Sequence, residues 1–598
     1  MSNATIAPIR FFETCISTVT AACFGMFSSL QSNSIVIVTT GIVGGYLASR
    51  IVYLFYFSPL SNIKGPFISI MFPISLLYHL SKGKAQEYQL KQHQKYGQVL
   101  RAGPYHVSLT NPEDWKRLLA SHRYVKGMTP LIKIFGAPNI FTTDDPEINK
   151  ARRRLIKPAF TTTHIAAMEQ SILEAGPIAL KRKIDQAIED HENSFVFGSG
   201  SSNSNSSSSS SSRDKKENKN GTAAKINHVD DFQYMALDVI GELAFGGSFG
   251  MLNGGQQSNT VVLDGVHSMN LISMLEVMIP YFDKFERLVI PSMVKKVDDF
   301  LEFTRQVIYK RIEETTTNTP AKSTKEGKST SPQLPPPPVP QDILQVFIEA
   351  YQQGSAIYGL KEADLVSEIC TQMFAGTDTS STTLSWTLFL LMVYPETYKK
   401  VCEEIRTTYP DRSKPITYTE GLSKLPYLEA VIYESMRIQP TSANSLTRII
   451  PEPGFELSNG QFLPAGTECL IPIYSIHHDE QFWKDHHKFL PDRFLVSDKN
   501  GAEDVSANKK NLMIFSSGIR VCPGRNLAMC KIFMTLANIL RDYDFWLPED
   551  MVEFGPDVID DETGEPKIIP GFLGITYTPR YSERDGWICV KHNVAPSQ

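Results

Sequence analysis

The stretch FSSGIRVCPG, Phe515–Gly524, constrains the fold more than any other part of this chain. Gly518 permits a backbone shape that residues with a Cβ resist, and the Pro-Gly pair after Cys522 forces a turn. A strong helical pattern, Arg525–Arg541, follows directly. The dipole and free N–H groups of a helix N-terminus favour an anion. The sequence therefore predicts a loop that presents one thiolate at the start of a helix.

Such a thiolate has two possible uses. A nucleophile needs a nearby base, and the stretch contains no histidine. A haem ligand needs a lone soft anion, N–H groups directed at the sulfur, and a cation for the propionates, which Arg520 provides. The remaining alternative is an incidental cysteine in a turn.

A second motif, MFAGTDTSSTT (Met373–Thr383), lies inside a long helical pattern and breaks local helix preference. The small residues Ala375 and Gly376 leave room beside the helix for a diatomic ligand. Asp378 and Thr379 are candidates to relay protons to that ligand. The alternative is a kinked core helix whose small residues allow close packing.

A third motif is YLEAVIYESMRIQP (Tyr427–Pro440). Glu434 and Arg437 are three residues apart and share one helix face, with apolar neighbours that favour burial. A buried ion pair needs further partners, and FLPDRF supplies a candidate in Arg493. The expected role of these three residues is structural.

In these motifs the chain resembles the cytochrome P-450 superfamily, whose cysteine signature Phe-x-x-Gly-x-Arg-x-Cys-x-Gly matches at all five fixed positions. The resemblance implies a mainly α fold with small β-sheets. It implies one large domain with haem b between a long central helix and the cysteine loop. ARRRLIKPAF resembles the family's propionate-binding helix, but Asn149 stands where the family often has Trp or His.

The resemblance assigns roles to residues of this chain. The implied roles are: Cys522, axial iron ligand; Phe515 and Gly524, its loop; Arg153, Arg448 and Arg520, propionate contacts; Ala375, Gly376, Asp378 and Thr379, oxygen activation; Glu434, Arg437 and Arg493, the structural triad. For Arg153 and Arg448 the alternative is a solvated surface charge.

The implied activity is a monooxygenase reaction that inserts one oxygen atom of O₂ into a lipophilic substrate, such as a fatty acid, steroid or xenobiotic. Electrons would come from NADPH through a membrane-bound cytochrome reductase, with cytochrome b5 a further candidate partner. Candidate docking residues for an acidic partner flank the loop, with a solvated charged face as the alternative: Lys509, Lys510, Arg525 and Lys531. Three alternatives stay open: a haem-thiolate isomerase or dehydratase, a peroxygenase, and a non-catalytic membrane lipid-binding protein.

The N-terminal region, residues 1–57, predicts a membrane anchor. Ser34–Phe57 is long and apolar, with one charge, Arg50, and roughly 20 such residues span a bilayer. Positive residues stay on the cytosolic side, so we expect the catalytic part to face the cytosol. The resemblance to the membrane-anchored members of the family implies the endoplasmic reticulum as the membrane. A buried core helix is the alternative. The net charge of −5 gives no support to nucleic-acid binding.

Residues 58–67 are expected to form a hinge, and 68–598 the catalytic domain with low-complexity insertions at 198–221 and 316–341. The Ser-rich and Pro-rich insertions, together with the long anchor, are typical of a eukaryotic, fungal chain. The apolar segment Met269–Val294 is expected to cover the substrate pocket and touch the membrane. Helices are predicted at 360–391, 398–407, 427–437 and 525–541, and strands near 99–110, 469–474 and 574–578.

Overall fold

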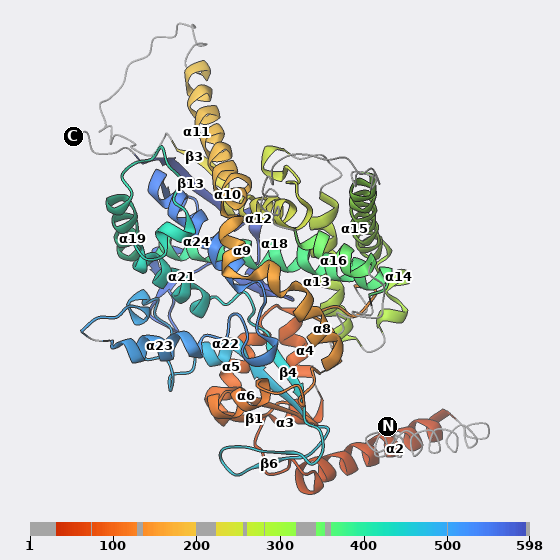
Figure 1. Ribbon diagram of the computed structural model, residues 1–598. Helices are drawn as coiled ribbons and strands as arrows, with labels where there is room; N and C mark the ends of the chain where they lie inside the picture. Colours follow the sequence, from red (N-terminus) through yellow and green to blue (C-terminus); the bar gives the residue numbers. More distant parts are fainter. Residues whose placement is uncertain are drawn as a thin grey trace, which may run out of the picture. The chain divides into compact units, whose positions relative to one another are not determined.

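The structure is a computed structural model that describes residues 32–72, 74–127, 135–198, 223–254, 260–279, 282–317, 342–352, 360–498 and 500–593. The expected insertions at 198–221 and 316–341 lie outside the described residues, except at their first positions. The described chain is mainly helical with small sheets, as the sequence predicts (Figure 1). It divides into two compact units.

The first unit comprises 1–78, 88–127 and 446–472. Its sheet has the strand order β1-β2-β7-β4, in which β2 and β7 run parallel. Its helices and strands are α2 (Ser32–Val52), α3 (Phe67–Met71), α6 (Pro112–Leu119), β1 (Val99–Arg101), β2 (His106–Leu109), β4 (Ser445–Ile449), β5 (Phe455–Glu456), β6 (Phe462–Leu463) and β7 (Glu468–Pro472), with α4 (Ile74–Ser81) and α5 (Ala85–Tyr96) at its boundary.

One helical stretch among the described residues, Val38–Phe57, is long and apolar enough to cross a membrane, with a mean hydropathy of 1.3. It comprises most of α2 and a turn of π-helix that follows. The end of this stretch and the segment after it are both attached to β1, because Arg101 donates from its side chain to Leu54 O at 2.7 Å and from its backbone to Lys64 O at 2.8 Å. A Cβ on Gly65 would lie 2.0 Å from Arg101 O, so only glycine allows this close approach.

The second unit comprises 79–87, 128–445 and 473–598. Its helices are α8 (Pro146–Ile156), α9 (Thr162–Ala167), α10 (Glu169–Leu173), α11 (Ala179–Gly198), α12 (His228–Phe245), α13 (Thr260–Met278), α14 (Glu286–Val289), α15 (Pro291–Thr317), α16 (Ile343–Gln352), α18 (Glu362–Val393), α19 (Pro395–Thr408), α20 (Tyr418–Gly421), α21 (Pro426–Ile438), α22 (Ile473–His477), α23 (Ala502–Asn511), α24 (Arg525–Asp542) and α25 (Ser582–Asp585).

The strands of the second unit form one antiparallel sheet, β3-β13-β8, and two hairpins. They are β3 (Ala224–Asn227), β8 (Tyr543–Trp546), β9 (Gly555–Ile559), β10 (Pro566–Lys567), β11 (Gly571–Leu573), β12 (Tyr577–Pro579) and β13 (Trp587–His592). The four helices predicted from periodicity are α18, α19, α21 and α24. The strand expected at 469–474 is β7, which ends at Pro472. Helix α22 begins at the next residue, Ile473.

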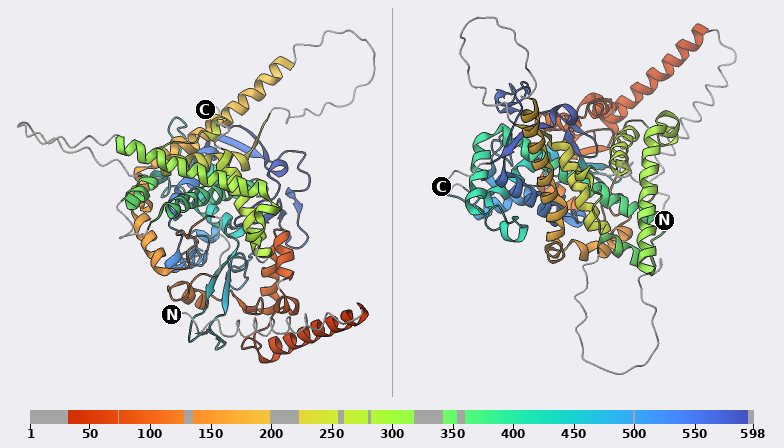
Figure 2. Two further views of the ribbon diagram at one scale, coloured as in Figure 1. Left: turned by 90° about the vertical axis from the view of Figure 1, so that its right-hand side faces the viewer. Right: turned by 90° about the horizontal axis from the view of Figure 1, so that it is seen from above.

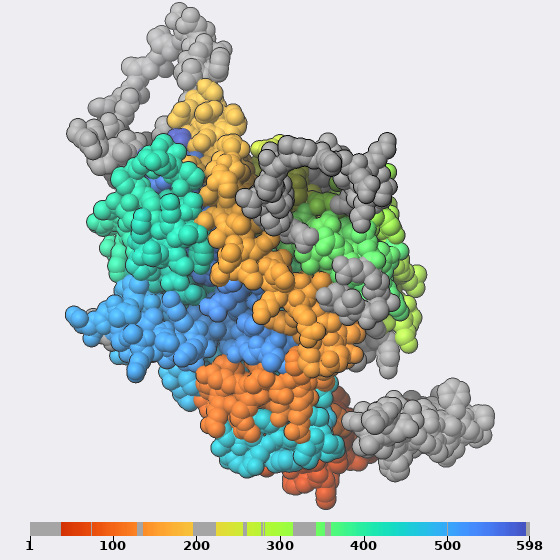
Figure 3. Space-filling model, viewed as in Figure 1, coloured from red at the N-terminus to blue at the C-terminus, as the bar shows by residue number. Residues whose placement is uncertain are grey.

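The central helix of the second unit is α18, whose 32 residues span about 48 Å. Its start is fixed by Asp364, which accepts a hydrogen bond from the Lys361 N–H at 2.8 Å. Helices α12, α15 and α24 pack on it, and α13 runs along α15 (Figure 2). Side chains from these helices form a large hydrophobic core cluster. Helix α19 lies at the outer surface, in teal in Figure 3.

Candidate active site

The loop around Cys522 has the shape that its sequence predicts. Gly518 has φ of +69°, the left-handed region that favours glycine, and Ser516 also has a positive φ, of 62°. The Cys522 N–H donates to Phe515 O at 2.8 Å and closes the loop. Helix α24 begins at Arg525, so the thiol lies three residues before the first helical residue.

Cys522 differs from the other cysteines that the structure describes, because all of those are buried and Cys522 is exposed. Desolvation by the neighbouring residues nevertheless raises the pKa of the thiol. The Gly524 N–H and the charge of Arg153 oppose that rise. The helix N-terminus alone therefore does not hold the thiolate that the sequence predicts, whereas a coordinating metal would deprotonate it.

Two arginines lie close to this loop. Arg520 donates to Thr143 O at 2.9 Å, and its pKa is lowered by burial and then by the charge of Arg153. Burial also lowers the pKa of Arg153, which is in α8. Among the described residues neither arginine forms an ion pair, although the charges of Asp144 and Asp145 favour the charged form of Arg520. Two neighbouring, partly buried cations are stabilised by an anion between them, which is the chemistry of the haem propionates.

Two further positions bear on the expected propionate site: Asn149, which departs from the family pattern, and Arg448, a predicted contact. Asn149 is buried and donates to Ile140 O at 3.0 Å, while its Oδ1 has no hydrogen-bond partner in the described part of the chain. Arg448 is in β4 of the first unit, where it is 3% exposed and donates to Thr447 O at 2.7 Å. Because it is buried, the alternative of a solvated surface charge is wrong for Arg448.

An open stripe on α18 marks the second part of the site. From 365 to 393 every residue of this helix is buried except Ala375, Gly376 and Thr379. These three positions lie on one face because residues i, i+1 and i+4 are adjacent on a helix. Thr379 donates from Oγ1 to Ala375 O at 2.7 Å. In a helix buried on all other sides, the stripe is surface that a bound group can contact.

Asp378 lies on a different face of α18 from Thr379. Its buried carboxylate accepts a hydrogen bond from Thr576, and burial raises its pKa. It lines a cavity of about 250 Å³ between α12, α13, α18 and the β11–β12 hairpin, to which His267 and Asn270 also contribute. An acid that opens onto a polar cavity has a route for exchanging protons with solvent.

Gly376 has a packing role in addition to any role in ligand binding. A Cβ at this position would lie 2.3 Å from Cδ1 of Ile240 on α12. Ile240 therefore fills, on this side, the space that the sequence predicts for a diatomic ligand. Of the two small residues Ala375 and Gly376, Ala375 is the accessible one. Close helix packing is thus a sufficient reason for glycine at 376.

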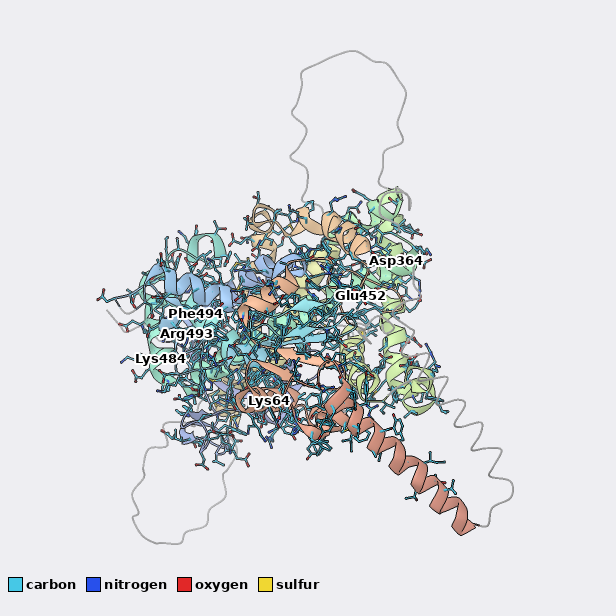
Figure 4. All side chains as sticks on the ribbon, turned by 90° about the horizontal axis from the view of Figure 1, so that it is seen from below. Lys64, Asp364, Glu452, Lys484, Arg493 and Phe494 are labelled. Carbon is cyan, nitrogen blue, oxygen red and sulfur yellow. The ribbon has the colours of Figure 1, made fainter. Side chains whose placement is uncertain are left out.

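The expected triad residues are in contact. Glu434 and Arg437 are both 0% exposed and paired at 2.8 Å, and Arg493 donates to Glu434 at 3.0 Å. Arg437 also donates to three backbone carbonyls, those of His477, His486 and Lys488. Arg493 reaches Lys484 O at 3.0 Å, and Figure 4 shows the two residues side by side. The buried charges are therefore fully hydrogen-bonded.

The described residues fit a haem by three observations of different kinds: an exposed thiol in the loop before a helix, two neighbouring arginines that form no ion pair with a described residue, and an accessible stripe on an otherwise buried helix. No group of three or more metal-binding side chains occurs among the described residues.

Comparison with known proteins identifies the family. A family model for cytochrome P-450 matches residues 206–557, more than half of the chain. The chain belongs to the cytochrome P-450 family. Three similar proteins, all from the fungus Aspergillus fumigatus, are the cytochrome P-450 monooxygenases helB3, helB1 and helB2.

The alignments with these relatives cover nearly the whole chain. The protein helB3 is 30% identical over 550 residues, which is 90% of this chain and 95% of the relative. For helB1 the identity is 29% over 99% of this chain and 92% of the relative, and for helB2 it is 27% over 90% and 95%. The chain is therefore a monooxygenase of the cytochrome P-450 type, as the resemblance implied, and these three relatives are fungal.

The structure corrects the expectation for one of the four docking cations. Lys531 is 1% exposed, so it is unable to dock a partner. Lys509 is paired with Glu429 at 3.1 Å, and Arg525 lies over the Phe515 ring. Lys510 is exposed. The periodicity of α24 could have revealed the burial of Lys531, because residues four apart share a helix face and Lys531 lies four residues after the buried Leu527.

Sequence reasoning missed two neighbours of the oxygen-activation motif. Thr576 contacts Asp378 from 198 residues further along the chain, and Ile240 contacts Gly376 from 136 residues before it. No local pattern predicts either contact, because both depend on how distant segments pack.

Proposed function

We propose that this protein is a membrane-anchored haem-thiolate monooxygenase that oxidises a lipophilic substrate with electrons from an NADPH-dependent cytochrome reductase. The observation that carries the proposal is that one compact unit holds both the exposed Cys522 thiol and the open stripe of α18, and that the helix directly after Cys522, α24, packs on α18. In this proposal residues 1–57 are the anchor, 58–67 the connection, and 68–598 the catalytic domain with insertions at 198–221 and 316–341.

Cys522 is the residue proposed to ligate the haem iron, held by the loop of Phe515 and Gly524. Arg153, Arg448 and Arg520 are proposed to bind the propionates. Bound haem supplies the one-electron and dioxygen chemistry that no side chain provides. The triad of Glu434, Arg437 and Arg493 stabilises the segment that precedes the loop and takes no part in the chemistry.

Asp378 and Thr379 are proposed to deliver protons to the site. Thr379 lies on the open stripe, and its hydroxyl is oriented by Ala375 O. Asp378 opens onto the polar cavity, where Thr576 holds its carboxylate. Because burial raises the pKa of Asp378, the carboxyl takes up a proton more readily than an exposed aspartate.

The substrate and membrane assignments rest on apolar surface. In the segment expected to touch the membrane, Phe285, Leu288 and Val289 are 56%, 82% and 61% exposed. Large exposed apolar side chains in a cluster are typical of a contact with lipid or another protein. We infer that this segment contacts the bilayer of the endoplasmic reticulum, and that substrates enter from the lipid.

A carbon monoxide difference spectrum of the reduced full-length protein tests the proposal. The red-shifted band of a thiolate-ligated haem is expected for the wild type and is expected to be lost in Cys522→Ser. An unshifted wild-type band would overturn thiolate ligation. A requirement for NADPH and reductase then separates the monooxygenase from an isomerase, dehydratase or peroxygenase, and a protein without bound haem would be a lipid binder.

A further inference from the structure

A lysine is buried against the open stripe of α18. Lys531 of α24 is 1% exposed, and its Nζ donates to Gly376 O at 2.6 Å. Burial lowers its pKa to about 7, and no nearby carboxylate opposes that shift. None of the ion pairs between described residues includes Lys531.

Burial of an amine in this setting is costly, because desolvation of the ammonium is not offset by a counter-charge. Methionine has a side chain of similar length and would fill the same volume without that cost. Packing therefore does not explain the residue type at position 531. The hydrogen bond to Gly376 is the contact that only a donor supplies.

The contact lies at the open stripe itself. The carbonyls of Ala375 and Gly376 are consecutive, and each accepts a side-chain donor, from Thr379 and Lys531 respectively. Side-chain donors to helix carbonyls bend helices and shift the local backbone. Ile240 of α12 packs where a Cβ of residue 376 would be. The backbone at Gly376 thus has close neighbours on both α12 and α24.

We propose that Lys531 is a positioning residue. It holds the Gly376 carbonyl and thereby sets the backbone of the α18 stripe, against which the diatomic ligand of the haem lies. This inference rests on the proposed function, since it assumes that haem binds between Cys522 and α18. Lys531 acts through Gly376 and touches no reacting atom. Its effect is on the geometry and rigidity of the stripe.

The test compares full-length wild type with Lys531→Met in three measurements. We expect the variant to keep the red-shifted carbon monoxide band, which shows that the haem-thiolate site has formed. We expect the infrared stretch of bound carbon monoxide to shift or broaden, because the stripe next to it has moved. We expect faster hydrogen exchange in the α18 peptide that contains Gly376. Lys399→Met, which removes an exposed lysine on α19, is the control and should leave all three unchanged.

The outcomes are distinct. A purely structural lysine would lower the melting temperature without a change in the carbon monoxide stretch, whereas a positioning lysine leaves the melting temperature unchanged or higher. Lys531→Gln, which keeps an N–H donor, should give an intermediate stretch. Identical stretch and exchange in wild type and Lys531→Met would overturn the proposal, as would the failure of both variants to hold haem. A wild type without the red-shifted band would instead overturn the proposed function.

Discussion

The hydroxyl of Thr576 donates a hydrogen bond to the buried carboxylate of Asp378, and the two residues are 198 positions apart in the chain. The carboxylate also lines a polar cavity. This contact joins the C-terminal part of the chain to the middle of α18 and gives Asp378 a defined orientation.

Asp378→Asn should separate activity from stability. Loss of a proton-transfer group lowers turnover by about 100-fold or more. Burial raises the pKa of Asp378 in the folded state, so the unfolded chain loses this proton at lower pH. Wild-type stability therefore falls as pH rises above about 4, the ordinary pKa of aspartate. The asparagine variant escapes this loss and should be at least as stable at pH 7. Turnover assays and thermal melts from pH 4 to 8 measure both effects. A variant that is fully active would contradict the proton-delivery role.

Glu434→Gln should destabilise the second unit severely. The change leaves Arg437 and Arg493 without their buried counter-charge, and breaking such a pair costs about 3–5 kcal/mol. We expect a large decrease in the free energy of unfolding and little haem-loaded protein. Glu429→Gln is a matched control on the same helix, because its partner Lys509 is partly exposed and such pairs contribute about 0–1 kcal/mol. Denaturant unfolding compares the two, and equal losses would refute a special role of the triad.

Arg153→Met should weaken haem binding and leave the haem-free protein intact. A charge-assisted hydrogen bond contributes about 2 kcal/mol, which corresponds to a roughly 30-fold faster loss of haem. In the haem-free protein the change removes repulsion with Arg520, so its melting temperature should not fall. The rate of haem transfer to apomyoglobin measures the effect. Arg154→Met, at the exposed next position, is the control. Equal transfer rates for both variants would exclude Arg153 as a propionate contact.

Deletion of residues 1–57 should leave part of the membrane affinity. Leu288 and Val289 remain as exposed apolar surface that can insert at the lipid interface. Adding Leu288→Ser and Val289→Ser should release the truncated protein in a vesicle flotation assay. Val552→Ser, at another highly exposed valine, should have no effect. If the truncated protein with both serine substitutions still floats with vesicles, the second membrane contact is not at Leu288 and Val289.

Much of the fold and part of the site follow from local patterns. Helical periodicity predicts α18, α19, α21 and α24 within a few residues, because each buries an apolar face or is buried throughout. The signature around Cys522 predicts its loop and the helix that follows, because glycine and proline restrict the backbone locally. The spacing of Glu434 and Arg437 predicts their pairing, since residues three apart share a helix face.

Other features depend on packing between segments that are distant in sequence. Lysine is usually a surface residue, yet Lys531 is buried in α24, and its Nζ donates a hydrogen bond to Gly376 O on α18. The sequence gives no sign of this partner. The glycine itself is explained by Ile240 of α12. Patterns of residue type and spacing describe only what lies within a few turns of one segment. Which side chain meets which across helices is set by the close packing of the whole unit, and only the tertiary structure decides it.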